Sequence, residues 1–433
     1  MTDADLNARI AAVWRNESGS VIAKLTRMVR DVGQAEELAQ DALVAALEHW
    51  PREGMPDNPG AWLMTTAKHR ALDRLRQLAM QARKHEAIGN DLEALQAHVV
   101  PDFVDGLDAA RADDIGDDLL RLIFIACHPV LSTEARVALT LRLLGGLSTA
   151  EIARAFLASE PTIAQRIVRA KRTLAAAQVP FEVPGPTERA ARLASVLEVI
   201  YLIFNEGHAA TAGDDWMRPA LCDDALRLGR VLAMLMPREP EVHGLLALLE
   251  IQASRMSARL DAQGRPVLLQ QQDRLRWDPL LVERGLAALA RSDDLAARRG
   301  PYTLQAALAA CHARAATVAD TDWPQIVALY DALSALAPSP VIELNRAVAV
   351  GMAYGPQAAL DIVERLEQDQ LLPGYPWLHG VRGDLLEKLG RIEAARAAFR
   401  QAARMTGNAQ ERELLLQRAQ ARPDPGAGNR SAG

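Results

Sequence analysis

The residues from Glu160 to Arg172 include side chains that can read DNA bases. Glutamine and arginine can make paired hydrogen bonds to base edges, and lysine and arginine also contact phosphate. This segment has four basic residues and one acidic residue, which gives it a local charge of +3. A solvated basic face on an ordinary helical hairpin is the alternative interpretation. The residues expected to contact DNA here are Thr162, Gln165, Arg166, Arg169, Lys171 and Arg172.

Two short helices joined by a tight turn are expected to position these side chains. Ser148 and Glu151 have the spacing of a capping box, which predicts a helix from Thr149 to Leu157. A turn at Ala158–Glu160 follows, and Pro161 suits the first turn of the next helix. The pattern predicts a helix-turn-helix, in which the second helix enters the major groove.

A second basic helix is predicted upstream, beginning after the helix cap Asn58 and Pro59. Its apolar face is expected to consist of Leu63, Ala67, Ala71, Leu75 and Leu78. A basic helix that carries an aromatic residue can receive single-stranded DNA by phosphate attraction and base stacking. The tryptophan could instead be a core anchor. The DNA-contacting residues expected here are Trp62, Lys68, His69, Arg70, Arg74 and Arg76.

The composition predicts an all-α chain. Its 433 residues are rich in alanine and leucine, which favour helices, and its formal charge is -6. The three cysteines are far apart, as expected for buried thiols, and no glycine-rich phosphate loop is present. No signal peptide or membrane-spanning run is apparent, so we expect a cytoplasmic protein with no membrane partner, and neither an enzyme nor a protein that uses a cofactor or metal.

The chain divides by pattern into several parts. We expect a helical domain at 1–85, an acidic linker at 86–116 and the helix-turn-helix domain at 117–178. A proline-rich joint then leads to a helical C-terminal domain at 188–421 and a disordered tail at 422–433. Within 300–421, similar segments recur with a step of about 35 residues, from Gly355 to Gly390, which is close to the period of tetratricopeptide (TPR) hairpins.

The two basic elements, in this order, resemble regions two and four of a sigma factor of the extracytoplasmic-function (ECF) class of the sigma-70 family. Glu37, Gln40 and Asp41 match that family's acidic helix, and Pro59, Trp62, Leu63, Asp73 and Arg76 match its promoter-melting segment, with His69 where asparagine is common. The long tail is similar to that of a subgroup with a C-terminal TPR-like extension. Its matching blocks are IFIACHP, YLIFNEGH and QQDRLRWD.

The resemblance implies a role for each matching element. Glu37, Gln40 and Asp41 would bind core RNA polymerase at the beta-prime clamp helices, and region four would lie near the beta flap. Region two would melt and read the minus-ten promoter element. Region four would read the minus-thirty-five element. The TPR-like face would bind a protein or peptide, or polymerase itself, and so restrain or support activity.

Polar residues of the C-terminal domain have two interpretations, namely a small-ligand or partner pocket and a buried network that holds helices together. The alternative for the whole chain is a stand-alone helix-turn-helix regulator with a sensing domain. A scaffold or hydrolase whose hairpins merely mimic a helix-turn-helix is a third possibility. The polar residues in question are Asn205, Glu206, His208, Asp273, Arg274, Trp277 and Asp278.

Overall fold

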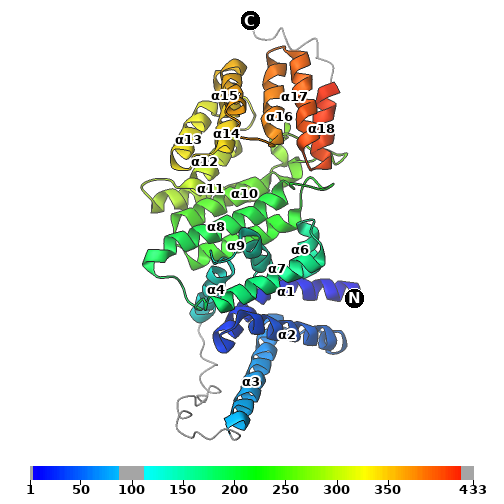
Figure 1. Ribbon diagram of the computed structural model, residues 1–433, viewed down its shortest axis with the longest axis vertical. Coiled ribbons are helices and arrows are strands. Elements are labelled where there is room, and N and C mark those ends of the chain that lie inside the picture. The colour runs from blue at the N-terminus through cyan, green and yellow to red at the C-terminus, as the bar shows by residue number, and fades with distance from the viewer. Residues whose placement is uncertain (1–2, 87–111, 421–433) are drawn as a thin grey trace. The chain divides into compact units, whose positions relative to one another are not determined.

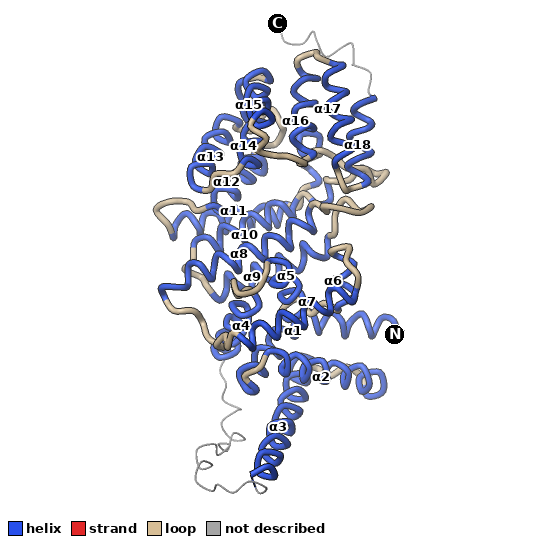
Figure 2. Tube along the Cα trace, in the orientation of Figure 1, coloured by secondary structure: helices blue, strands red, loops and turns tan. Residues whose placement is uncertain are grey.

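The computed structural model describes residues 3–86 and 112–420, and all the regular elements within these ranges are helices (Figures 1 and 2). This confirms the all-α prediction. Most of the predicted linker and all of the predicted disordered tail lie outside the described residues. No helix of the described ranges is long and apolar enough to cross a membrane.

The chain divides into two compact units, Met1–Leu202 and Ile203–Gly433. The division falls within α8 (Pro186–His208), whereas the sequence predicted a joint before residue 188. The first half of α8 packs on the helix-turn-helix domain. Ser195 Oγ donates to the Cys127 carbonyl at 2.6 Å, and Arg136 donates to Glu198 at 2.9 Å.

Three long helices form the N-terminal part of the first unit: α1 (Asp3–Val29), α2 (Val32–Glu53) and α3 (Pro59–Glu86). Asn58 Oδ1 accepts from Ala61 N at 3.0 Å, so the predicted cap of α3 is confirmed. Pro51 lies in the last turn of α2, and the Gly54 N–H donates to the Trp50 carbonyl, so the connection to α3 begins at Gly54.

The apolar face predicted for α3 is buried over half of its length. Leu63, Ala67 and Ala71 are at most 1% exposed, whereas Leu78 is 39% exposed. Leu75 has an intermediate exposure. The predicted periodicity therefore continues beyond the part of α3 that the core covers.

Four further helices complete the described part of the first unit before α8. They are α4 (Ala112–Ala126), α5 (Thr133–Leu143), α6 (Thr149–Ala155) and α7 (Glu160–Ala176). Helix α1 packs on α4 as well as on α2 and α3, so the two predicted DNA-reading domains share one core. Gly146, in the connection between α5 and α6, also packs closely against α1. Its φ is +68°, and a Cβ atom there would lie 2.8 Å from Ser18 Oγ of α1.

The second unit begins with a group of helices. The helices are α9 (Pro219–Leu235), α10 (Pro240–Ser254), α11 (Pro279–Leu295) and α12 (Pro301–Arg314). Three short 3-10 turns lie in the connection between α10 and α11. The 3-10 turns are η1 (Met256–Ala258), η2 (Leu269–Gln271) and η3 (Arg274–Arg276).

Helical hairpins follow, with neighbouring helices packed side by side (Figure 1). Gly383 of α16 shows how closely they pack, because a Cβ atom there would lie 2.7 Å from the Phe399 ring of α17. The helices are α13 (Trp323–Leu336), α14 (Pro340–Tyr354), α15 (Pro356–Gln368), α16 (Pro376–Lys388), α17 (Ile392–Met405) and α18 (Ala409–Gln420).

Candidate nucleic-acid interface

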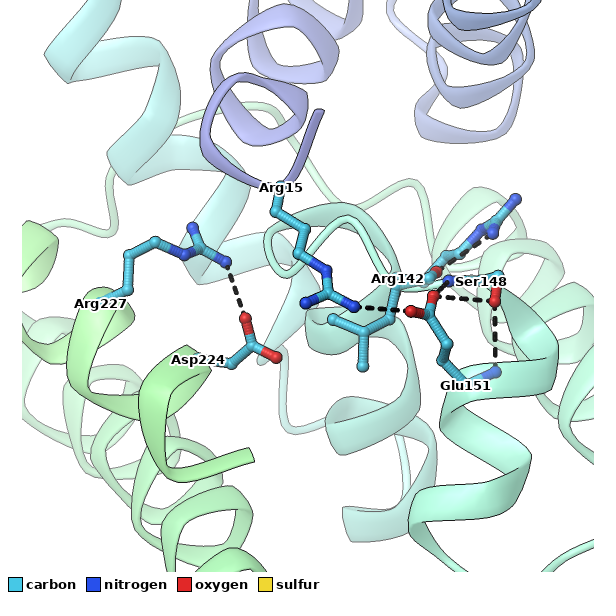
Figure 3. A network of polar contacts seen from close by, with 7 residues as sticks. Arg15, Arg142, Ser148, Glu151, Asp224 and Arg227 are labelled. Carbon is cyan, nitrogen blue, oxygen red and sulfur yellow. Dashed lines mark hydrogen bonds and ion pairs between the residues drawn. The ribbon is translucent and has the colours of Figure 1, made fainter. Parts of the chain in front are cut away.

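Helices α6 and α7 form the helix-turn-helix, and α6 begins with the predicted capping box. Ser148 Oγ accepts from Glu151 N at 3.2 Å, while Glu151 Oε2 accepts from Ser148 N at 2.8 Å. Arg15 of α1 also donates to Glu151, at 2.6 Å (Figure 3). Burial raises the pKa of Glu151, but the hydrogen bonds from Ser148 and Arg15 outweigh it and lower the pKa overall. The first helix of the motif is thus fixed both locally and to α1.

Helix α7 separates a buried row from an exposed row. Ile163, Ile167, Ala170 and Leu174 are at most 5% exposed, at the spacing of one helical face. The opposite face presents Thr162, Gln165, Arg169 and Arg172 to solvent, while Arg166 is half-buried.

A hollow of 430 Å³ lies beside this exposed row, between α7 and the start of α5. Gln165, Arg166 and Arg169 line it together with Ser132 and Glu134. Hydrogen bonds from the backbone and Ser132 lower the pKa of Glu134, and the charge of Arg166 adds to this. The arrangement has the donors and the positive charge that a base edge and a phosphate require.

Lys171 lies apart from the exposed row. It is paired with Glu36 of α2, and only 21% of its side chain is exposed. Arg142 Nε of α5 donates to the same carboxylate at 2.5 Å. Glu36 itself is 4% exposed, so one buried carboxylate joins α2 to two helices of the helix-turn-helix domain. We call Glu36, Arg142 and Lys171 the interdomain latch.

Sequence reasoning did not identify Glu36, although a signal for it existed. Glu36 follows Val32 by four residues and precedes Ala39 by three, which puts it on the apolar face of α2. A carboxylate on that face needs a partner from another element. Its neighbour Glu37 lies on the exposed face.

The predicted polymerase-binding residues of α2 are accessible. Glu37 and Asp41 are exposed, and Gln40 is half-buried. Asp41 Oδ2 lies 3.6 Å from Arg70 Nη1 of α3, but both side chains are more than 40% exposed, so this ion pair contributes little stability. A partner could replace it at low cost.

The predicted DNA-contacting residues of α3 differ in exposure. Trp62 is half-buried and packs edge-on against Trp50, with ring centroids 5.4 Å apart, so part of its surface serves the core. Lys68 is also half-buried. His69, Arg70, Arg74 and Arg76 are exposed, and Arg76 has a local ion pair with Asp73 at 3.3 Å.

The polar residues singled out in the C-terminal domain lie in two segments, and most of their polar groups already have local partners. Glu206 is paired with Arg218, and Arg274 donates to the Ala315 carbonyl at 2.6 Å. Asp273 and Asp278 accept from backbone N–H groups at the starts of η3 and α11. Asn205 is exposed, whereas His208 and Trp277 are buried. A structural network accounts for most of these contacts.

The three cysteine thiols should resist alkylation in the folded protein. Cys127 is 1% exposed, and burial raises its pKa to about 11. Burial also raises the pKa of Cys222, to about 12. Because the thiolate is the reactive form, we expect iodoacetamide at pH 8 to label the native chain at least ~100-fold more slowly than the denatured chain. Rapid native labelling at any of the three cysteines would contradict this burial.

Comparison with known proteins agrees with this geometry. Residues 14–80 match the family Sigma-70 region 2, and residues 121–174 match Sigma-70, region 4. Residues 192–293 match a family of unknown function (DUF6596). No solved structure matches this chain.

Relatives of two kinds were found. An uncharacterized protein, R00370 of Rhizobium meliloti (strain 1021), is 46% identical over 389 residues, which cover 89% of each chain. The ECF RNA polymerase sigma factor SigK of Mycobacterium bovis (strain BCG / Pasteur 1173P2) is 31% identical over 173 residues, which cover 39% of this chain and 84% of SigK. SigC of Mycobacterium tuberculosis (strain CDC 1551 / Oshkosh), also an ECF sigma factor, is 26% identical over 179 residues, which cover 41% of this chain and 89% of SigC. The chain therefore belongs to the ECF sigma factors of the sigma-70 family and carries a long helical C-terminal extension.

Proposed function

We propose that this chain binds core RNA polymerase through the exposed face of α2 and directs it, in the cytoplasm, to specific promoters. Helix α3 would melt and read the minus-ten element, and α7 would read the minus-thirty-five element. The observation that carries the proposal is the exposed row Gln165, Arg169 and Arg172, in a chain that also has the basic helix α3 beside exposed carboxylates on α2. A stand-alone DNA-binding regulator needs neither of the latter two features.

Transcription in vitro tests the proposal directly. Core polymerase alone should not initiate on promoter fragments from the source genome, and addition of the full chain should produce discrete transcripts. A stand-alone regulator would instead bind DNA without polymerase and would leave core polymerase unable to initiate. Absence of transcripts from every fragment, with polymerase that is active with another sigma factor, would reject the proposal.

The interdomain latch implies that the two DNA-reading domains separate on a promoter. The minus-ten and minus-thirty-five elements are about 25 base pairs apart, or ~85 Å at 3.4 Å per base pair. The path from Gln165 to Trp62 runs along α7 to Lys171, across the latch, along α2 from Glu36 to Trp50, and across the Trp50–Trp62 contact. Its helical parts span about 30 Å at 1.5 Å per residue, and each of the two helix-to-helix contacts adds about 8–10 Å, for a total of about 50 Å. We therefore propose that the latch opens when polymerase and promoter bind.

The C-terminal unit is proposed to control this initiation activity. Truncation after Leu202 tests it, because the truncated chain keeps the contacts of α8 with the helix-turn-helix domain. Higher transcript yield than from the full chain would assign a restraining role, and lower yield a supporting role. An unchanged yield would contradict control by this unit.

Truncation after Pro180 should destabilise the first unit, unlike truncation after Leu202. The shorter chain lacks Ser195 and Glu198, so Arg136, which is 9% exposed, loses two of its partners. A hydrogen bond to a charged group contributes about 1.5–3 kcal/mol, and Arg136 would keep only its bond to Thr133. We expect a lower melting temperature for the shorter chain, measured by circular dichroism. Equal melting temperatures would show that α8 does not support the first unit.

A further inference from the structure

Arg255 and Arg259 of the second unit have no carboxylate partner among the described residues, whereas other arginines there are paired. Arg230 pairs with Glu250 at 2.8 Å, and Arg299 with Asp293 at 2.7 Å. Arg259, by contrast, is 6% exposed and donates to the Met217 sulfur at 3.1 Å, with its guanidinium 5.7 Å from the Trp216 ring centroid. Arg255 is half-buried, and its Nε has no hydrogen-bond partner among the described residues.

These arginines belong to a group of basic side chains from four segments. Arg255 ends α10, and Arg259 follows η1. Burial, followed by the charges of Arg259 and Arg255, lowers the pKa of His208 at the end of α8. Burial, followed by the charges of Arg255 and Arg274, lowers the pKa of His312 in α12 to about 4. We call this group the cationic cluster: His208, Arg255, Arg259, Arg274 and His312.

Among the described residues, no carboxylate balances the charge of Arg255 or Arg259, whereas the charge of Asp320 acts on Arg274. Glu206 forms an ion pair with Arg218, and Glu250 forms one with Arg230. The C-terminus of α10 contributes only about half a negative charge beside Arg255. Buried charges are normally paired, because removal from water costs several kcal/mol per ion. An anion would supply the missing partner.

Several hydrogen-bonding atoms around the cluster are also unsatisfied. His208 is 9% exposed, and its Nε2 has no partner among the described residues. The same holds for Arg274 Nε, His312 Nδ1 and Trp277 Nε1. The guanidinium of Arg274 lies 5.7 Å from the Trp277 ring centroid. Buried polar atoms rarely lack partners, so such a concentration indicates a site for a missing group.

A hollow next to His312 has room for a small organic group beside the cationic cluster. Its volume is 290 Å³, and His312, Gln270, Trp323 and Trp377 are among the residues that line it. The His312 ring packs edge-on against Trp323, with centroids 5.3 Å apart. A site that combines aromatic walls with a few convergent polar groups suits a small molecule.

We propose that the cationic cluster binds a small molecule through a carboxylate or phosphate group, with the rest of the molecule in the adjoining aromatic hollow. The oxyanion would accept hydrogen bonds from Arg255 and Arg259 and would pair with their charge, because Arg274 already donates to the His312 and Ala315 carbonyls and to Thr321 Oγ1. This site is independent of the DNA-reading helices, and its ligand would act on the second unit.

Calorimetric unfolding of the full chain tests the site, with sodium phosphate and sodium succinate as probes and sodium chloride at equal ionic strength as the reference. An anion that binds the native state raises Tm by about 3–5 °C for each tenfold excess over its Kd. A rise with phosphate alone identifies a phosphate site, and a rise with succinate alone a carboxylate site. A rise with both supports a general oxyanion site. Absence of a rise above the chloride reference with both probes overturns the proposal.

The variant Arg255→Met separates a ligand site from a structural arginine. We expect it to raise Tm without added anion, because it removes an unpaired charge, and to abolish the rise caused by phosphate or succinate. Arg259→Met is a second variant with the same expected loss of response. Arg230→Met is the matched control, because it removes a paired arginine; it should lower Tm and keep the anion response. Retention of the full response in both Arg255→Met and Arg259→Met would overturn the proposal.

Discussion

Replacing Arg169 by alanine is expected to lower promoter-dependent initiation by about 5- to 150-fold, because a bidentate contact to a base contributes ~1–3 kcal/mol. Arg169 lies in the exposed row of α7 and lines the hollow beside it, next to Gln165. The measurement is run-off transcription with core polymerase on a promoter that the wild-type chain recognises. The result rests on the proposed function of the chain.

Arg169→Lys shows whether base reading or charge is responsible. Lysine keeps the positive charge but lacks the planar fork that matches a base edge. We expect the lysine variant to bind DNA with nearly the wild-type salt dependence while discriminating poorly among bases at one promoter position. Arg189→Ala, an exposed substitution at the start of α8, is the control and should initiate normally. Wild-type activity of Arg169→Ala would contradict the proposed base contact of Arg169.

Replacing Glu36 by glutamine is expected to open the interdomain latch. Glu36 is the shared partner of Arg142 and Lys171, and its side chain is 5% exposed. Removing one partner of a buried ion pair costs ~3–5 kcal/mol. Because Arg142 and Lys171 keep 18% and 21% of their side chains exposed, we expect about 3 kcal/mol, which shifts the opening equilibrium roughly 100-fold.

Opening of the interdomain latch can be followed by fluorescence energy transfer between the N-terminal helical domain and the helix-turn-helix domain. Gln77 of α3 and Thr173 of α7 are exposed, so cysteines introduced there can be labelled while the three native thiols stay buried. Glu36→Gln should lower the transfer efficiency. Glu37→Gln, an exposed neighbour, is the matched control and should leave it unchanged. Lys171→Met should have a smaller effect, because Arg142 still pairs with Glu36. Equal efficiency in all four chains would show that the latch does not hold the domains together.

The local elements of this protein were predictable because their signals lie within a few residues of one another. The capping box of Ser148 and Glu151 and the cap of α3 at Asn58 formed as expected. The buried row of α7 follows from its spacing alone. The all-α class follows from composition and helical periodicity, and the sigma family from the order of two motifs.

Contacts between distant segments could not be predicted from such local sequence signals. From the sequence, Lys171 was predicted to contact DNA. In the structure it pairs with Glu36, which lies 135 positions earlier. The charge of Arg255 and Arg259 is likewise recognised as unpaired only in the folded chain, where no carboxylate of the described residues balances it. Helical periodicity specifies which face of a helix is buried, but not which helix covers it. Tertiary packing therefore decided which charges form the interdomain latch, which are exposed to solvent on α7, and which lack a carboxylate partner among the described residues.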